Sequence, residues 1–321
     1  MRLISLEDIK KIIPGIDLFP IIKEGFVAYS SGNAVVPPVG EMTFDNPQGD
    51  VHIKYGYIKD DKYFVVKIAS GFYGDSDKGI IPTQGGMMLL FDKSTGKELA
   101  ALVDECYLTN IRTAVAGGIC AEILAPEKIN CIGVIGTGVQ ARMQVLFLSE
   151  IIECRKLKVW GRNKKNLSKY KNDISMKGWD VEIVNSTDDI AESCNLIITA
   201  TPSKVALLKL DKIKPGTHIT ALGSDSIGKQ ELEPEILDRA DLIIADSISQ
   251  CIERGEIAHA LKNKLIDIDD IIELGEVIHS NKDFRCKNNQ ITVADLTGVA
   301  VQDIQIAKAV YKAYKELKNE I

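Results

Sequence analysis

The stretch Cys131-Ile132-Gly133-Val134-Ile135-Gly136-Thr137-Gly138-Val139-Gln140-Ala141 indicates the fold of this chain. A short apolar run, expected to be a buried strand, leads directly into the pattern Gly-x-Gly-x-x-Ala and then into a helical pattern. Gly136 allows the tight turn from strand to helix, Gly138 lets backbone N–H groups approach a pyrophosphate, and Ala141 lets helix and strand pack closely. We therefore predict a dinucleotide-binding loop; an ordinary turn between a strand and a helix is the alternative. The candidate cofactor contacts in this loop are Gly136, Thr137, Gly138, Val139, Gln140 and Ala141.

The composition is that of a globular protein large enough for two domains. The chain has 321 residues, of which 45% are hydrophobic and 26% charged, and this length exceeds that of a usual single domain. A formal net charge of −6 provides no basic surface for nucleic acid. The seven cysteines never occur in a CxxC spacing, which favours a reducing compartment over disulfides or a structural zinc site. Without a signal-peptide core or a membrane-spanning apolar run, we expect a cytoplasmic protein that binds neither nucleic acid nor membranes.

Strand and helix patterns alternate after the glycine loop, which is typical of a parallel, doubly wound sheet. The expected strands there are Lys156–Trp160, Asp180–Val184, Leu196–Ala200, Thr217–Gly223 and Leu242–Asp246. Before about residue 115, turn signals separate strand patterns of a mixed or antiparallel sheet, at Asp50–Tyr57, Tyr63–Ser70, Met87–Phe91 and Glu98–Val103. Helices are expected near Asp8–Ser30, at Leu108–Leu124 and at Asp303–Leu317. The predicted fold class is α/β: a Rossmann doubly wound parallel sheet plus a second domain of α+β type.

Basic residues follow the second expected strand after the loop. A carboxylate at this place binds the ribose 2′-hydroxyl in sites that prefer NAD. Here Trp160-Gly161-Arg162-Asn163-Lys164 contains no carboxylate, and a guanidinium group suits a 2′-phosphate. Arg162, Asn163 and Lys164 therefore favour NADP(H). NAD(H) is the alternative, because a solvated basic turn or an arginine stacked on adenine accounts for the same residues. Thr199, Ala200 and Thr201, at the end of a later strand, are further candidate cofactor contacts.

Two cations stand in unexpectedly apolar surroundings. Lys67 lies in Tyr63-Phe64-Val65-Val66-Lys67-Ile68-Ala69, where burial would disfavour its charge unless the lysine is paired or functional. Arg112 lies near the start of a small-residue helix, a place that favours anions. A substrate carboxylate would explain Arg112. The competing explanations are an edge strand for Lys67 and an ion pair with Asp104 for Arg112.

Asp225 is the candidate acid or base. It follows an expected strand of the nucleotide domain, and ligands bind beyond the carboxyl ends of such strands. A carboxyl group there could exchange a proton during hydride transfer to carbon. The equal alternative is an N-cap preceding a helix over Gly228–Leu232. The four histidines are scattered without an H-x-x-x-H pair, so no metal is expected.

Taken together, these segments resemble the ornithine cyclodeaminase/mu-crystallin family over nearly the whole chain. The resemblance rests on five motifs that occur in the family's order along the chain. They are Gly85-Gly86-Met87-Met88-Leu89-Leu90-Phe91-Asp92, Tyr107-Leu108-Thr109-Asn110-Ile111-Arg112-Thr113-Ala114, Gly136-Thr137-Gly138-Val139-Gln140-Ala141, Gly223-Ser224-Asp225 and Asp295-Leu296-Thr297-Gly298-Val299-Ala300-Val301-Gln302-Asp303. It implies a homodimer. It also implies a substrate-binding and dimerisation domain made of 1–115 with 303–321, and a Rossmann dinucleotide-binding domain over 116–302.

The resemblance also implies roles for individual residues. By position, Lys67 and Arg112 match the family's contacts to the substrate carboxylate, and Asp225 matches its acid/base residue. Asp295, Thr297 and Gly298 match a loop near the nicotinamide.

One departure concerns the substrate. Many family members carry an arginine just after a Pro-Pro pair, whereas this chain has Pro37-Pro38-Val39-Gly40-Glu41. The loss of that bidentate contact argues against the ornithine reaction. The segment around His52 and Lys54 looks more like the ectoine-utilisation branch and its imine-reducing relatives. His52 and Lys54 alternate on one face of the expected strand, as replacement cationic contacts to an acidic substrate or as surface residues.

The leading hypothesis is an NAD(P)H-dependent imine reductase or amino-acid dehydrogenase acting on a small 2-imino or 2-amino acid. Lys67 and Arg112 would hold the substrate carboxylate, and Lys67 and Asp225 are the candidate catalytic residues. One alternative is a cyclodeaminase that converts an amino acid to a cyclic imino acid and ammonia with recycled NAD. The other is a small-ligand-binding protein of mu-crystallin type that depends on NADPH.

Overall fold

A computed structural model describes residues 1–72, 83–280 and 282–318. The chain divides into two compact units, Met1–Arg112 with Val299–Ile321, and Thr113–Gly298. The limits expected from the sequence, 115 and 303, differ by a few residues. One reason concerns the closing helix α11 (Ala300–Leu317). The amphipathic pattern in the sequence starts only at Asp303, whereas the helix begins at Ala300. Its first turns are buried on all sides and therefore carry no amphipathic signal.

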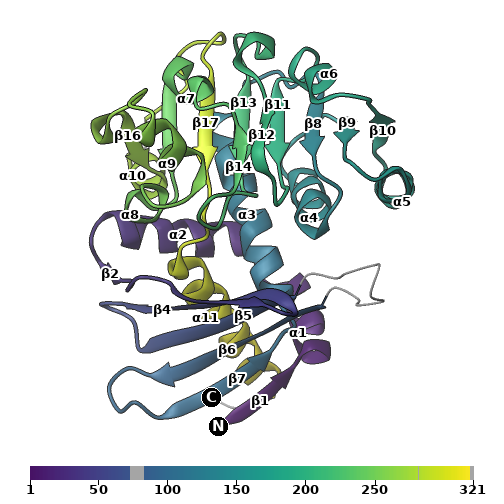
Figure 1. The fold of residues 1–321 in the computed structure, drawn as a ribbon. Helices are drawn as coiled ribbons and strands as arrows, with labels where there is room; N and C mark the ends of the chain where they lie inside the picture. The colour runs from purple at the N-terminus through teal and green to yellow at the C-terminus, as the bar shows by residue number, and fades with distance from the viewer. Residues whose placement is uncertain (73–82, 281, 319–321) are drawn as a thin grey trace. The chain divides into compact units, whose positions relative to one another are not determined.

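The unit Thr113–Gly298 contains an eight-stranded sheet in the order β10-β9-β8-β11-β13-β17-β15-β16 (Figure 1), and all of its strand pairs are parallel. Its strands are β8 (Ile132–Ile135), β9 (Lys156–Trp160), β10 (Asp180–Ile183), β11 (Leu196–Thr199), β13 (His218–Ala221), β15 (Leu242–Ala245), β16 (Ile271–Glu273) and β17 (Thr292–Asp295). From β8 the chain proceeds to β9 and β10 on one side and then returns to β11 on the other. This reversal makes the sheet doubly wound, as predicted.

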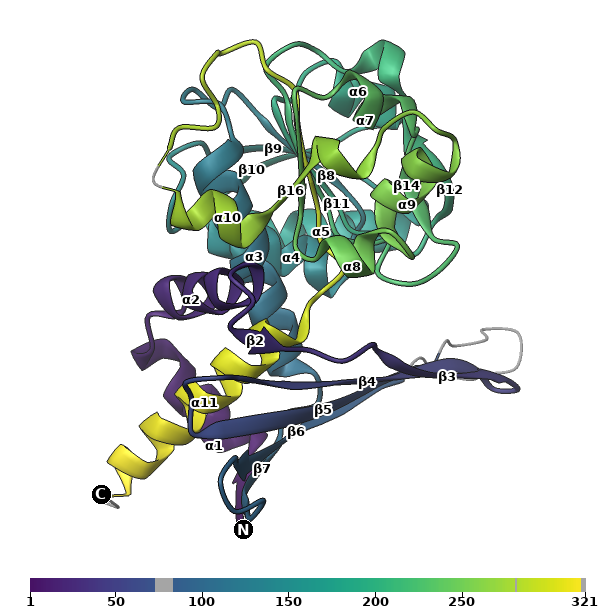
Figure 2. The same cartoon turned by 90° about the vertical axis from the view of Figure 1, so that its left-hand side faces the viewer.

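Helices cover both faces of this sheet, as a parallel sheet of apolar strands requires. Figure 2 shows α10 and α3 on one face and α6, α7 and α9 on the other. The helices are α3 (Tyr107–Leu124), α4 (Val139–Leu148), α5 (Lys164–Ser175), α6 (Thr187–Ala191), α7 (Glu235–Arg239), α8 (Ile248–Cys251), α9 (Gly255–Lys262) and α10 (Leu274–His279), with short 3-10 helices at Leu210–Lys212 and Ile268–Asp270. A separate parallel pair joins β12 (Lys204–Leu208) to β14 (Gln230–Leu232).

The central strand β17 was not expected from the sequence. Its residues, Thr292-Val293-Ala294-Asp295, have a polar residue at each end and only a short apolar pair between them. All four are nevertheless buried, because β17 pairs with β13 on one side and β15 on the other. Position in the sheet, rather than composition, therefore determines this strand.

The other unit contains a mixed sheet in the order β1-β7-β6-β5-β4-β2, with β3 paired to β4. Its strands are β1 (Arg2–Ser5), β2 (Ala34–Val35), β3 (Gly40–Asp45), β4 (Gln48–Ile58), β5 (Tyr63–Phe72), β6 (Thr83–Asp92) and β7 (Glu98–Val103). Only β1 pairs in parallel, with β7, among the strands described. The expected opening helix is two helices, α1 (Leu6–Ile12) and α2 (Leu18–Ser30), because Pro14-Gly15 interrupt it in a 3-10 turn, Ile13–Gly15.

Helix α11 lies along one face of this mixed sheet, against β4, β5 and β6 (Figure 2). Side chains of a strand alternate between the faces, so Lys54, Lys67 and Met88, which pair in register, share the face toward α11 and are buried. Their neighbours Tyr55 and Met87 point to the opposite face and are exposed. Two lysines are therefore placed beneath a helix.

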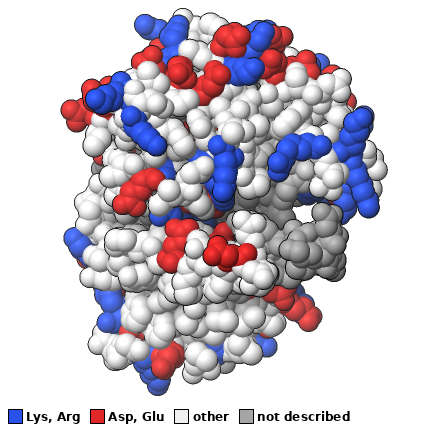
Figure 3. All heavy atoms as spheres, viewed as in Figure 1, with Lys and Arg blue, Asp and Glu red and all other residues white. Residues whose placement is uncertain are grey.

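Charged side chains of both signs are interspersed over the face of the molecule drawn in Figure 3. Within residues 1–72, 83–280 and 282–318, no helix has both the length and the apolar character needed to cross a membrane. The same residues contain no group of three or more His, Cys, Asp or Glu side chains placed to hold a metal ion.

Candidate active site

The glycine loop lies where the winding of the parallel sheet reverses. Gly136 follows β8 and has a φ of +126°, a backbone conformation that favours glycine. A Cβ on Gly136 would lie 2.6 Å from the carbonyl oxygen of Ala200, which follows the neighbouring strand β11. Gly138, by contrast, is the N-cap of α4 and has open space where a Cβ would stand. This open space beside the start of a ten-residue helix fits a pyrophosphate group.

The basic residues after β9 are exposed in the structure. Arg162 and Lys164 are solvent-accessible, and Asn163 is the N-cap of α5, where its side chain accepts a hydrogen bond from the backbone N–H of Asn166 at 3.1 Å. The Asn163 side chain thus has a structural role, whereas Arg162 and Lys164 present exposed cationic groups just after this strand.

Four of the remaining candidate cofactor residues, Thr199, Thr201, Asp295 and Thr297, are engaged within the protein through their side chains, and Gly298 is engaged through its backbone N–H. The Thr199 and Thr201 hydroxyls donate to Glu231, each at 2.7 Å. The Asp295 carboxylate accepts from the backbone N–H of Ile257 at 2.9 Å. The Thr297 hydroxyl and the Gly298 N–H donate to Asp246 at 3.0 and 2.6 Å. Cofactor contacts from these residues stay a prediction.

A buried ion cluster forms where α11 crosses the mixed sheet. The Nζ of Lys67 lies 3.1 Å from Oδ2 of Asp303, and Nε of Arg112 lies 3.0 Å from Oδ1. Nη1 of Arg112 also donates to Oε1 of Gln302 at 3.2 Å. All four residues are buried. Among the described residues, the Nε2 of Gln302 has no hydrogen-bond acceptor, so this cluster retains an unused donor.

Burial and charge act against each other in this cluster. Burial lowers the pKa of Lys67, and the charge of Arg112 adds to that effect while Asp303 opposes it. Burial alone would raise the pKa of Asp303, but the charges of Arg112, Lys67 and Lys54 hold that pKa below its ordinary value. The Asp303 carboxyl group therefore lies in the field of three basic side chains.

The structure corrects two expectations about the two cations. Lys67 does not lie on an edge strand, since β5 pairs with both β4 and β6, and only 3% of the residue is exposed. Arg112 pairs with Asp303 rather than with Asp104. Asp104 instead accepts a hydrogen bond from the backbone N–H of Leu108 at 2.8 Å, near the start of α3.

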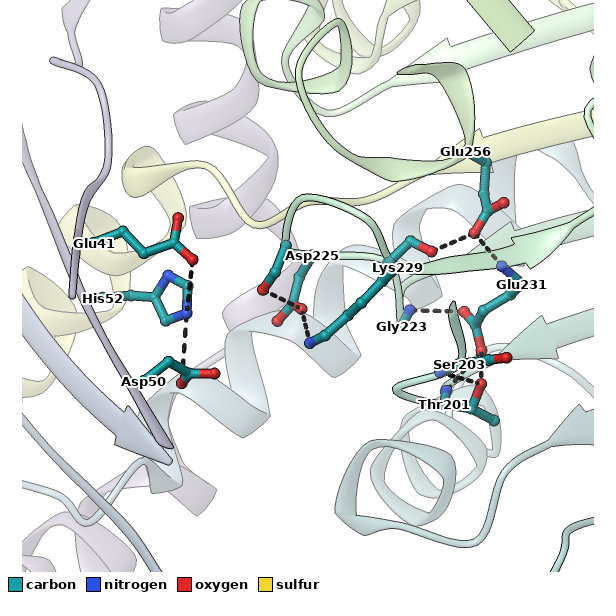
Figure 4. A network of polar contacts seen from close by, with 12 residues as sticks. Glu41, Asp50, His52, Thr201, Ser203, Gly223, Asp225, Lys229, Glu231 and Glu256 are labelled. Carbon is teal, nitrogen blue, oxygen red and sulfur yellow. Dashed lines mark hydrogen bonds and ion pairs between the residues drawn. The ribbon is translucent and has the colours of Figure 1, made fainter. Parts of the chain in front are cut away.

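His52 and Lys54 differ in surroundings although they share a face of β4. Lys54 is buried and contributes to the field at Asp303. His52 is half-buried, with Nε2 3.5 Å from Asp50 and 3.9 Å from Glu41 (Figure 4). His52 is therefore not a fully exposed surface residue, and Lys54 belongs to the buried ion cluster around Asp303.

Asp225 belongs to the Thr113–Gly298 unit, in the segment that follows β13. Its carboxylate lies 2.6 Å from Nζ of Lys229 (Figure 4), and it accepts from the Ser226 hydroxyl at 3.1 Å. The alternative role as the cap of a helix is wrong, because no helix forms at Gly228–Leu232. Gly228 has a φ of +83° in a turn, and Gln230–Leu232 is strand β14, paired with β12. The Asp225 side chain remains half exposed.

Several residues of the site were not found from the sequence alone. Asp303 and Gln302 stand in a motif used for the resemblance, but their partners lie 191 and 190 positions away. A signal was present: polar side chains at 302 and 303 interrupt an otherwise apolar helix start. Lys229 and the buried Glu231 were missed, because the sequence offered a helix over Gly228–Leu232 as the alternative where the structure has a turn and strand β14.

The chain matches known proteins along nearly its whole length. Residues 3–318 match the family model described as the ornithine cyclodeaminase/mu-crystallin family. An uncharacterized cyclodeaminase of Sinorhizobium fredii is 32% identical over 320 residues, which cover 98% of this chain and 96% of that protein.

Two solved structures share the fold. An archaeal alanine dehydrogenase, a dimer with bound NAD, has a TM-score of 0.89 and 31% identity, with 99% of this chain and 97% of that chain covered. The Δ1-pyrroline-2-carboxylate reductase of Thermococcus litoralis, in complex with NADH and L-proline, has a TM-score of 0.91 and 28% identity, with 99% and 98% covered.

Proposed function

Because the chain belongs to the ornithine cyclodeaminase/mu-crystallin family, we propose that it is an NAD(P)H-dependent reductase of small 2-imino acids. The reverse reaction is the oxidation of the matching amino acid. The buried cluster of Lys67, Arg112 and Asp303 is the observation that supports this function most strongly. Its excess of positive charge suits an anionic substrate, and a carboxylate is what a planar guanidinium binds best.

The side chains of the cluster bind and orient the substrate. Arg112 and Lys67 attract the substrate carboxylate, while Asp303 keeps both cations in place when the site is empty. The unused Nε2 donor of Gln302 adds a further hydrogen bond to the same carboxylate. Held in this way, the substrate presents its C=N bond in a fixed orientation, which lowers the entropic cost of the reaction.

A nicotinamide dinucleotide held at the glycine loop around Gly136 and Gly138 would supply the hydride for the imine carbon. Asp225 exchanges the proton at the substrate nitrogen, and Nζ of Lys229 lies 2.6 Å from its carboxylate. In the oxidative direction the same carboxylate accepts a proton from the amine. Lys67 thus orients the substrate, and Asp225 takes the acid/base role.

The cofactor preference is the finer part of the proposal. The parallel sheet with its glycine loop supports a nicotinamide dinucleotide, and the neighbours with bound NAD and NADH agree with this. Exposed Arg162 and Lys164 at the end of β9, with no carboxylate among residues 160–166, favour a 2′-phosphate and hence NADPH.

The function is tested by following oxidation of NADPH and NADH with mixtures of 2-oxo acids and ammonia or methylamine, oxaloacetate and cyclic ketimines included. The Asp225→Asn variant is expected to lose about 100- to 10,000-fold in kcat and to bind NADPH as the wild type does. Asp238→Asn, an exposed carboxylate on α7, is the matched control and should keep full activity. If Asp225→Asn left turnover intact, the acid/base role of Asp225 would be wrong. If the wild type reduced no mixture, a purely ligand-binding protein would be favoured instead.

A cyclodeaminase is the second candidate, since a relative with 32% identity bears that name. The two reactions differ in cofactor balance. With L-ornithine and a trace of NAD, a cyclodeaminase releases ammonia without net change in the nucleotide. Ammonia release under these conditions would overturn the reductase assignment for that substrate.

We also propose a homodimer formed through the open face of the mixed sheet. This face carries apolar side chains, including Tyr55 and Met87, which are 39% and 38% exposed. Apolar surface of this kind marks an interface, and the similar alanine dehydrogenase is a dimer. Light scattering should show a monomer for Tyr55→Lys/Met87→Lys and an unchanged assembly for Leu317→Lys, a control that lies on an exposed site of α11. A monomeric wild-type protein would refute the proposal.

A further inference from the structure

Glu231 is a buried glutamate that the proposed chemistry leaves without a role. It lies on β14, and its side chain has no exposed surface. Its Oε1 accepts from the backbone N–H and the hydroxyl of Thr201, at 2.6 and 2.7 Å. Its Oε2 accepts from the Thr199 hydroxyl at 2.7 Å and from the Gly223 N–H at 2.9 Å. One carboxyl group therefore joins the end of β11 to the end of β13 (Figure 4).

A second buried glutamate secures the next residue of the same segment. Oε1 of Glu256, on α9, accepts from the Ser224 hydroxyl at 2.5 Å and from the backbone N–H of Glu231 at 2.8 Å. Its Oε2 accepts from the Leu232 N–H at 2.9 Å. Gly223 and Ser224, the two residues before Asp225, are thus each held by a buried carboxyl group.

The packing at Gly223 allows little displacement. A Cβ there would lie 2.2 Å from the carbonyl oxygen of Thr201 and 2.5 Å from Oε2 of Glu231. The segment that leads to Asp225 therefore lies directly on the segment that follows β11. Two adjacent buried carboxyl groups are costly, because burial and mutual repulsion both oppose their charge. Such a pair contributes little to stability through core packing. Its role is therefore to fix the backbone groups from which it accepts hydrogen bonds.

We infer that Glu231 is a positioning residue for Asp225. By accepting from Gly223 N–H and from Thr201 on the adjacent strand end, it sets where the chain leaves β13 and so where the Asp225 carboxylate stands. The inference rests on the proposed acid/base role of Asp225. Glu256 supports the same segment one residue later through Ser224.

The main test uses Glu231→Gln. An amide nitrogen cannot accept a hydrogen bond, so either the Thr201 N–H or the Gly223 N–H loses its acceptor. A small displacement of a reacting group costs up to about 100-fold in rate, so we expect kcat to fall about 10- to 100-fold. The substrate is oxaloacetate or pyruvate, mixed with ammonia or methylamine, and the mixture used is the one that the wild type turns over fastest. The matched control is Glu233→Gln, in the same segment, whose Oε2 accepts only from the Leu210 N–H at 2.9 Å among the bonds described. This control should keep the wild-type kcat.

Combination with Asp225→Asn separates positioning from a general structural role. If Glu231 acts through Asp225, adding Glu231→Gln to Asp225→Asn changes kcat by no more than about twofold, because coupled residues are not additive. A further 10- to 100-fold loss in the double variant, as for independent effects, would overturn the inference. Full activity of Asp225→Asn would refute the proposed function instead, so the two failures are distinguishable.

Hydrogen exchange of the backbone gives a readout that needs no substrate. In Glu231→Gln, exchange should accelerate at 199–203 and 222–226, whereas Glu233→Gln should affect only the segment around Leu210. Unchanged exchange at both segments in Glu231→Gln would contradict the inference. If that variant fails to fold, Ser224→Ala removes one hydroxyl donor beside Asp225 and should lower kcat in the same manner, again without effect on the Asp225→Asn background. An additive loss there would equally count against positioning.

Discussion

The Nζ of Lys67 lies 3.1 Å from Oδ2 of Asp303, although 236 positions separate them (303 − 67). The same carboxylate also binds Arg112, at 3.0 Å. A buried carboxylate shared by two buried cations leaves a positive excess, and it keeps both side chains ordered before a ligand arrives. The cluster is thus both a structural element of its unit and a preorganised site for an anion.

Replacement of Asp303 by asparagine should therefore destabilise the protein strongly. The variant leaves Lys67 and Arg112 buried without their carboxylate, and breaking a buried ion pair on one side costs about 3–5 kcal/mol. The free energy of unfolding, measured by urea titration, reports this loss. Glu7→Gln is the control, because Glu7 pairs with Lys11 at 2.7 Å on the surface of the same unit, where such pairs contribute about 1 kcal/mol or less. Equal effects of the two substitutions would contradict this account of the cluster.

Much of the fold could be predicted from the sequence, because apolar runs and turn signals are local. Strand β9 was expected at its exact limits, and the glycine loop lies where the motif placed it. β17 was missed because its burial depends on two neighbouring strands rather than on its own composition. Helix α11 was expected three residues late (303 − 300), because its fully buried start shows no periodicity.

The candidate site was predictable only in part, for a related reason. A lysine in an apolar strand signals an unusual environment, and Lys67 was found in this way. The sequence does not show which carboxylate lies opposite a buried cation: Asp104 is near Arg112 in the chain, but Asp303 is its partner. Likewise, Glu231 has no local signal, since its partners come from the ends of two other strands.

Alanine at the two loop glycines should have different effects. Gly136→Ala places a Cβ 2.6 Å from a backbone oxygen in a strained backbone conformation, so it should lower both the free energy of unfolding and the affinity for NADPH. Gly138→Ala meets nothing within 4 Å and should keep its stability. Its methyl group occupies the space assigned to the pyrophosphate, so the affinity for NADPH should still fall. Thermal unfolding and fluorescence titration with NADPH measure the two quantities. A Gly138→Ala variant with unchanged NADPH affinity would place the pyrophosphate elsewhere.

Replacement of Arg162 by serine should alter the cofactor preference. A charge-assisted hydrogen bond contributes about 1.5–3 kcal/mol, which corresponds to about 10- to 100-fold in affinity. We expect kcat/KM to fall by this factor with NADPH and to change little with NADH. Lys171→Ser, at an exposed position on α5, is the control and should leave the ratio unchanged. An equal fall with both cofactors would indicate that Arg162 contacts adenine rather than a 2′-phosphate.

The buried Glu231 should make stability depend on pH in a defined direction. Burial, with a further contribution from Glu256, raises the pKa of Glu231 from 4.5 to about 8 in the folded protein. Between these values the folded state binds more protons at this group than the unfolded state, so its contribution to stability is full below pH 4.5 and is lost as the pH rises through about 8. The slope is at most about 1.4 kcal/mol per pH unit.

The side chain of the Glu231→Gln variant does not titrate. The free energy of unfolding should therefore fall less steeply from pH 5 to pH 8 in this variant than in the wild type. Urea titrations at several pH values in this range measure the difference. The Glu233→Gln variant, run in parallel, controls for the loss of a carboxyl group from the same segment. Parallel pH profiles for the wild type and Glu231→Gln would mean that Glu231 stays ionised in the folded protein, held so by its four hydrogen-bond donors.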